Sequence, residues 1–157
     1  MPYDHLFQKA GSTTGSFIVE LDGVPIGRFT EVQGLEVSVE VATYNEGGVN
    51  GFTHQLPGRI SYPNLVLKRG VTWDNNLIEW FDNTSGANFL ATGKVVRESA
   101  AVTMISGTGQ RLRSWVLYDA MPVKWSGPSL ANDQDAVPTE ELEVIHHGFE
   151  SITFPGS

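Results

Sequence analysis

Histidine side chains are the first candidates for chemistry in this chain, because imidazole serves both as a metal ligand and as an acid–base group. The chain has four of them, His5, His54, His146 and His147. No spacing among them is typical of a metal site. The adjacent pair at 146–147 lies in a predicted strand, where neighbouring side chains point to opposite faces and cannot bind one ion. The chain has no cysteine, which excludes thiol nucleophiles and cysteine zinc sites. We therefore expect no metal.

Clustered carboxylates and a glycine pair are the next candidates. Glu140, Glu141 and Glu143 lie in one alternating stretch, which is more typical of a solvated strand than of a general acid–base pair. Residues 107–109 read Gly-Thr-Gly, but they lack the lysine and the strand–loop–helix context of a phosphate-binding loop, so they predict a hairpin turn. No Gly-x-Ser-x-Gly motif is present. The sequence thus predicts no enzyme activity and no cofactor.

Length and charge limit the remaining classes of function. A chain of 157 residues is typical of one domain that folds without a disulfide or a metal. Its 10 basic and 18 acidic residues give a net charge of −8, opposite to the charge that binding to nucleic acid requires. Neither a signal peptide nor a membrane span is predicted. We expect a chain that is made and folded in the cytoplasm and has no membrane anchor.

The elements that position these side chains are predicted to be mainly strands. Residues 16–22 alternate between apolar and polar types, and Asp22-Gly23 predicts a hairpin that returns through residues 25–30. Residues 36–42 alternate most clearly, with valines at 37, 39 and 41 predicted to face the core. Glu36, Ser38 and Glu40 then face water or a wet channel.

Residues 44–70 form the least ordinary stretch. A polar, glycine-rich loop at residues 45–51 contains Gly47 and Gly48, which permit backbone angles that other residues resist. Phe52 and Leu56 are apolar residues predicted to lie in the same loop, where a neighbouring molecule would cover them. A strand is predicted over residues 59–68, with an edge, bulge or break at Pro63.

One helix is predicted over residues 72–83, with Thr72 or Asp74 as its cap. Four residues at helical spacing form its predicted core face: Trp73, Leu77, Trp80 and Phe81. Further strands are predicted over residues 95–105, 112–120 and 139–149. The fold predicted is mainly β, two packed antiparallel sheets forming a sandwich or partly open barrel, with one flanking helix. A flexible arm (residues 1–15) and a tail (150–157) flank the domain at 16–149.

Several segments in order resemble the tail tube proteins of contractile phages and contractile injection systems. They are residues 17–24, 27–37, 44–50, 56–59, 62–70, 115–128 and 141–148. Single motifs such as Leu56-Pro57-Gly58 are unspecific, but the ordered set spans residues 16–149. The resemblance does not distinguish a phage tail from an injection system. It also does not distinguish the bulk tube subunit from related proteins at a tube end.

This resemblance implies a fold shared with the Hcp protein of type VI secretion and a purely structural role. It implies hexameric rings that stack into a hollow tube inside a sheath and are driven through a target envelope. The implied partners are copies of the chain, the sheath protein, the baseplate and the tube terminator, with protein cargo or DNA passing the lumen without specific binding.

Two sets of residues then receive a role by hypothesis. Contacts between subunits or rings are expected from Asn45, Glu46, Gly47, Gly48, Phe52, His54 and Leu56, and lumen-facing side chains from Glu36, Ser38 and Glu40. The alternative from another class is a monomeric ligand- or carbohydrate-binding β-sandwich, for which Trp115 and Trp125 are the candidate binding residues.

Overall fold

The computed structural model describes residues 14–44, 47–48, 51, 54–85, 87–94, 96–129 and 137–154. These residues form strands and two helices in the order β1 (Thr14–Leu21), β2 (Val24–Phe29), β3 (Glu31–Gln33), β4 (Ser38–Tyr44), β5 (His54–Ser61), β6 (Leu65–Gly70), α1 (Asn76–Thr84), α2 (Ala87–Thr92), β7 (Glu98–Ser106), β8 (Arg111–Ser126), β9 (Thr139–Ile145) and β10 (Phe149–Thr153). Neither described helix is long and apolar enough to cross a membrane.

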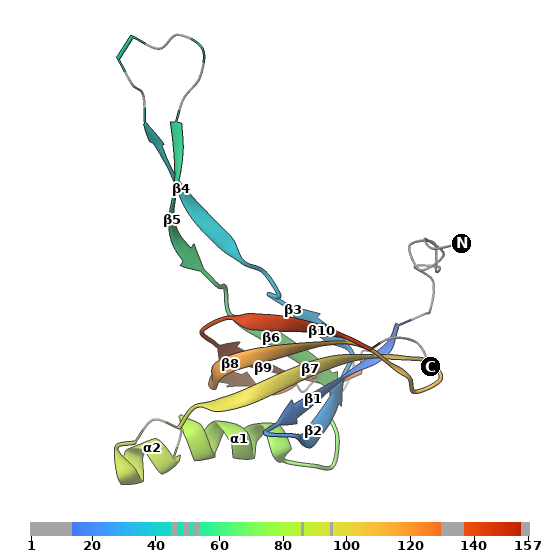
Figure 1. Cartoon of the computed structure of the whole chain (residues 1–157). Helices are drawn as coiled ribbons and strands as arrows, with labels where there is room; N and C mark the ends of the chain where they lie inside the picture. Colours follow the sequence, from blue (N-terminus) through green and yellow to red (C-terminus); the bar gives the residue numbers. More distant parts are fainter. Residues whose placement is uncertain are drawn as a thin grey trace, which may run out of the picture.

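The body of the molecule is one antiparallel sheet that folds over on itself (Figure 1). Its strand order is β2-β1-β7-β8-β9-β6-β3, and β10 pairs with β8. The fold-over occurs within β8, whose first part pairs with β7 up to Ala120 and whose second part pairs with β9 from Met121. Asp119, with a φ of 51°, lies just before this change of partner. Strands that pass from one layer to the other form the corners of packed sheets and partly open barrels.

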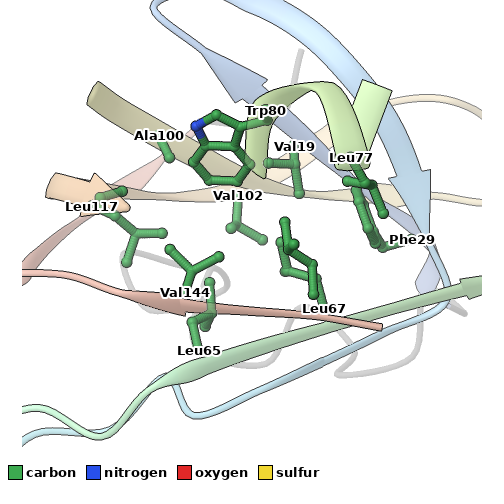
Figure 2. Packing of buried hydrophobic residues seen from close by; sticks show 12 residues of the cluster. Val19, Phe29, Leu65, Leu67, Leu77, Trp80, Ala100, Val102, Leu117 and Val144 are labelled. Carbon is green, nitrogen blue, oxygen red and sulfur yellow. The ribbon is translucent and has the colours of Figure 1, made fainter. Parts of the chain in front are cut away.

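The core lies between the two layers and under α1. Figure 2 shows Val19 and Val102 from one layer, Leu67 and Val144 from the other, and Trp80 from the helix. Each of these side chains is buried, and burying one such side chain contributes about 1.5–3 kcal/mol. The predicted fold class of two packed antiparallel sheets with a flanking helix is confirmed.

Helix α1 is shorter than predicted because the residues before it are held in a loop. Asp74 accepts hydrogen bonds from the hydroxyl of Thr72 at 2.7 Å and from the backbone N–H of Asn76 at 3.2 Å. These bonds satisfy polar groups at the helix start, so α1 begins at Asn76. Leu77 and Trp80 are buried and Phe81 is half-buried.

Trp73 does not share this face. It precedes α1, and its side chain is fully exposed in the single chain, so its predicted place on the core face was wrong. Of the three outcomes predicted at Pro63, the structure has the break: residues 62–64 separate two strands, β5 and β6. Helix α2, which follows α1 directly, was not predicted. Residues 1–13 of the predicted arm lie outside the described residues, and β10 occupies part of the predicted tail.

Candidate assembly surface

The β4–β5 hairpin lies outside the body of the molecule and is not covered by it. Its two strands pair with each other and not with the main sheet, and Figure 1 shows the hairpin extending away from the body. A two-stranded hairpin is at best marginally stable by itself in water. Stable order in this hairpin is therefore favoured by a covering surface, which the described residues of the chain do not supply.

One face of the hairpin is apolar. Val39 pairs with Ile60, and Val41 pairs with Pro57, and directly paired residues share a face. The exposed fractions of Val39, Val41 and Ile60 are 44%, 57% and 55%. The prediction that the valines face this chain's own core was therefore wrong. The alternating pattern correctly indicates one apolar face on this strand. No described residue of the same chain buries that face.

The opposite face is polar near the body, and Ala42 and Leu56 continue it with apolar side chains farther out. The hydroxyls of Ser38 and Ser61 lie 2.8 Å apart and form a hydrogen bond, and Glu40 shares the face of Ser38 by alternation. Both are exposed. Glu36 precedes β4 and is also exposed, with its backbone N–H bonded to the carbonyl of Gly34 at 2.8 Å. Their assignment to a lumen stays a prediction.

The predicted contact loop is only partly a loop. His54 and Leu56 lie in β5, paired with Tyr44 and Ala42, so the strand begins five residues before the predicted start at residue 59. The glycines and Pro57 obscured this strand, because such residues usually interrupt strands. Gly47 and Gly48 are exposed in the turn region, and Gly48 has a φ of +98°. Asn45, Glu46 and Phe52 lie outside the described residues.

The base of the hairpin is fixed at two places. Gly34 has a φ of +93°, and a Cβ at this position would lie 2.2 Å from the carbonyl oxygen of Asn64. Tyr62, at the other leg, packs against His146 and Phe149, with ring centroids 5.5 and 6.0 Å away. The hairpin therefore leaves the body in a direction set by close packing.

His146 and His147, the two histidines in the body, have structural partners, whereas His54 lies in β5 and His5 lies outside the described residues. His146 is buried, and its Nδ1 accepts the N–H of Gly148 at 3.1 Å. The ring of His147 lies 3.2 Å from the carboxylate of Asp119. Burial lowers the pKa of His146. Among the described residues no three His, Cys, Asp or Glu side chains are placed to hold a metal ion.

The three glutamates of β9 are likewise engaged separately. Glu140 is buried and pairs with Arg69 at 2.5 Å. Glu141 lies 3.8 Å from Lys68, and Glu143 accepts a hydrogen bond from Asn64 at 2.6 Å. No two of them converge on a common point in these contacts. The geometry of the described residues therefore supports an assembly surface better than a catalytic centre.

Comparison with known families gives one match that covers most of the chain. The model of the family described as T4-like virus tail tube protein gp19 matches residues 13–150. None of the curated proteins matches the chain.

Solved structures with a similar fold include tube components of contractile injection systems. A chain of the PVC sheath–tube complex in its extended state is 19% identical, with 96% of this chain and 97% of that chain covered at a TM-score of 0.76. A chain from the cap of the anti-feeding prophage is 22% identical, with 93% of both chains covered at a TM-score of 0.75. Hcp1 from Flavobacterium johnsoniae is 14% identical, with 87% and 94% covered at a TM-score of 0.50. At these identities the similarity establishes a shared fold.

Proposed function

This chain belongs to the family of T4-like virus tail tube proteins, and we propose that it is an inner-tube subunit without enzyme activity. Copies assemble into hexameric rings, and rings stack into a hollow tube inside a contractile sheath. The structures with a similar fold include chains from a baseplate, a sheath–tube complex and a sheath/tube terminator, which supports partners of these kinds. The particle is a phage tail or an injection system assembled in the bacterial cytoplasm.

The uncovered hairpin carries this proposal. In the assembled tube a second copy covers the apolar face formed by Val39, Val41 and Ile60, which removes exposed apolar surface at roughly 25 cal/mol per Å². Ring closure also pairs or covers open sheet edges, which otherwise favour aggregation. The turn region around Gly47 and Gly48, with His54 and Leu56 from β5, makes the further contacts between subunits or rings.

The polar face of the hairpin then lines the lumen. Ser38 and Glu40 lie on that face, and Glu36 continues it at the hairpin base. An acidic lumen repels nucleic acid and does not retain it. Cargo therefore passes without a specific binding site.

The test is a charge placed on the apolar face. We expect Val39→Asp to leave the circular dichroism and thermal unfolding of the single chain unchanged, because residue 39 contacts no core. The same variant stops assembly, because a carboxylate is costly in an apolar interface. Sedimentation velocity and negative-stain electron microscopy of the purified chain distinguish rings and tubes from monomers.

The matched control is Val24→Asp, at a β2 position that is 64% exposed in the single chain and remote from the hairpin. This variant continues to assemble. Tubes formed by Val39→Asp at wild-type concentrations contradict the proposed role of the hairpin. Rings formed without stacks would assign the apolar face to contacts between rings instead of contacts within them.

No observation favours a ligand-binding sandwich. Trp115 and Trp125 are half-buried within β8. The guanidinium carbon of Arg113 lies 5.5 Å from the ring centroid of Trp115, and the indole N–H of Trp125 is bonded to Glu140 at 3.3 Å. Both tryptophans are thus engaged by other side chains of the body, as structural residues of β8 would be.

A further inference from the structure

A fully exposed tryptophan lies on the loop between β6 and α1. Trp73 is in contact with solvent on every side, and Val71, two residues earlier, is 48% exposed. Exposed tryptophans are rare outside interaction sites, because the side chain combines a large apolar area with one hydrogen-bond donor. Tryptophan is also among the residues most enriched at the energetic centres of interfaces.

The loop that carries Trp73 is held rigidly. The buried Arg69 donates to the carboxylate of Asp74 at 2.8 Å, and Thr72 donates to the same carboxylate at 2.7 Å. The side-chain amide of Asn76 donates to the carbonyl of Ile26 at 3.0 Å, and the backbone N–H of Val71 donates to Pro138 at 3.0 Å. A loop fixed in this way loses little conformational entropy when its tryptophan is bound.

A complementary hollow lies at the opposite end of α1. It is lined by Thr84, Ser85, Phe89 and Met121 and has a volume of about 160 Å³. An engineered cavity of about 150 Å³ is known to hold a benzene molecule, so this volume is sufficient for an aromatic ring. We name it the α2 hollow.

The chemistry of the α2 hollow suits an indole. The ring of Phe89 and the thioether of Met121 both make favourable contacts with aromatic side chains. The hydroxyl of Ser85 donates to the carbonyl of Pro122, so its own lone pairs remain able to accept the indole N–H. The hollow therefore offers an apolar lining and one hydrogen-bond acceptor, which are the two requirements of a buried tryptophan side chain.

The occupant cannot be the tryptophan of the same chain. Ten residues lie between Trp73 and Thr84, and most of them belong to α1 (Asn76–Thr84), which alone spans about 12 Å at 1.5 Å per residue. We propose that Trp73 of one copy inserts into the α2 hollow of the next copy. Asp74 beside the tryptophan and Lys94, which is exposed two residues after α2, carry opposite charges suited to the rim of this contact.

Such a contact is head-to-tail, because the donor and acceptor are different surfaces of the same chain, and repeated contacts of this type close into rings or continue as filaments. The inference rests on the proposed assembly of copies, but it uses a surface separate from the β4–β5 hairpin. It adds a second interface at the helical side of the body.

A double-mutant cycle tests the pairing. We expect Trp73→Ala and Phe89→Ala each to raise the critical concentration for assembly about tenfold or more, with Val24→Ala as a matched exposed control that does not. The double variant is no worse than either single variant, because the two changes remove one contact. Additive effects, or no effect of Trp73→Ala, overturn the proposal. If Phe89→Ala lowers the melting temperature of the monomer, Ser85→Leu, which fills the hollow, replaces it in the cycle.

Chemical crosslinking gives an independent readout, because the natural chain has no cysteine. Val71→Cys and Leu90→Cys chains, which both keep Trp73 and Phe89, are mixed in equal amounts and treated with a short bismaleimide. A yield of mixed dimer well above the summed yield of the two homodimers, which is the random expectation, supports the pairing, and its absence overturns it. Val39→Asp separates the two proposals: if that variant assembles while the Trp73–Phe89 cycle shows coupling, the hairpin role fails and this contact stands. A wild-type chain that stays monomeric at every concentration overturns both.

Discussion

At the scale of single residues, the buried guanidinium of Arg69 is the feature that most constrains the body. It is only 2% exposed, and it joins Glu140 of β9 to Asp74 at the entrance of α1. Its carbon also lies 5.6 Å from the ring centroid of Phe29. Burial acts to raise the pKa of Asp74, but hydrogen bonds from Thr72 and Arg69 outweigh it, so the pKa is lowered. The carboxylate is thus held in its charged form.

Loss of Arg69 should therefore destabilise the fold strongly. We expect Arg69→Met to lower the free energy of unfolding by about 3–5 kcal/mol, because Glu140 stays buried without a counter-charge. The adjacent Lys68→Met is the control: its pair with Glu141 is partly exposed and 3.8 Å long, and we expect a change below about 1 kcal/mol. Urea unfolding of the unassembled chain measures both. Equal effects would mean that the buried pair adds nothing beyond a surface pair.

His146 should make stability depend on pH. Its Nδ1 already accepts the Gly148 N–H, and its buried Nε2 has no hydrogen-bond partner, so a second proton would break one bond in an apolar site. The pKa of the folded state is lowered by burial, below the unfolded value of about 6.5. The unfolded chain therefore binds the proton first as pH falls. The contribution of His146 is complete above about pH 6.5 and decreases at lower pH.

The corresponding measurement is unfolding between about pH 7.5 and pH 5. We expect the free energy of unfolding to fall toward pH 5 with a slope of up to about 1.4 kcal/mol per pH unit from this group. His146→Phe, which suits the neighbouring rings of Tyr62 and Phe149, should flatten the profile. His147→Gln, at an exposed position, should not. An unchanged slope in His146→Phe would assign the pH dependence to other groups.

At the scale of elements, the direction of the hairpin depends on the backbone at Gly34. Gly34→Ala should lower the free energy of unfolding by more than about 2 kcal/mol. The added Cβ causes strain at a positive φ and a clash with the carbonyl of Asn64. Gly48→Ala is the matched control. It has a similar φ of +98° but meets no atom within 4 Å, so only the backbone strain remains, and we expect the free energy of unfolding to fall by about 1–2 kcal/mol. Thermal unfolding compares the two, and equal losses would show that the clash is relieved without cost.

The elements also show what alternation in a sequence can predict. It places strands correctly where both layers belong to one chain, as in β6, where Leu65 and Leu67 are buried between half-buried neighbours. It misassigns β4, because Val39 and Val41 show the same pattern although both are exposed among the described residues. The spacing of Trp73 and Leu77 is helical by coincidence, since Asp74 holds the residues between them in a loop. Helix α2 has six residues, too few to show a helical period.

At the scale of the whole molecule, the described part of this chain leaves large apolar side chains exposed. Its body has a closed core, but the β4–β5 hairpin presents apolar side chains and the loop before α1 presents a tryptophan. The histidines and glutamates of the body instead make structural contacts with neighbouring residues. Function could therefore be predicted from the sequence only through the ordered resemblance to tail tube proteins, because no local motif encodes an assembly of copies.

Salt dependence distinguishes the forces that would hold such an assembly together. Each copy carries a net charge of −8, so neighbouring copies repel, while the proposed hairpin interface is apolar and insensitive to screening. Raising sodium chloride from about 50 mM to about 500 mM shortens the screening length from about 14 Å to about 4 Å. We expect the critical concentration for assembly to fall several-fold, measured by sedimentation.

Val39→Asp should remain monomeric at both salt concentrations, which controls for nonspecific salting out. A rise in critical concentration with salt would show instead that opposite charges across the interface outweigh the repulsion between copies.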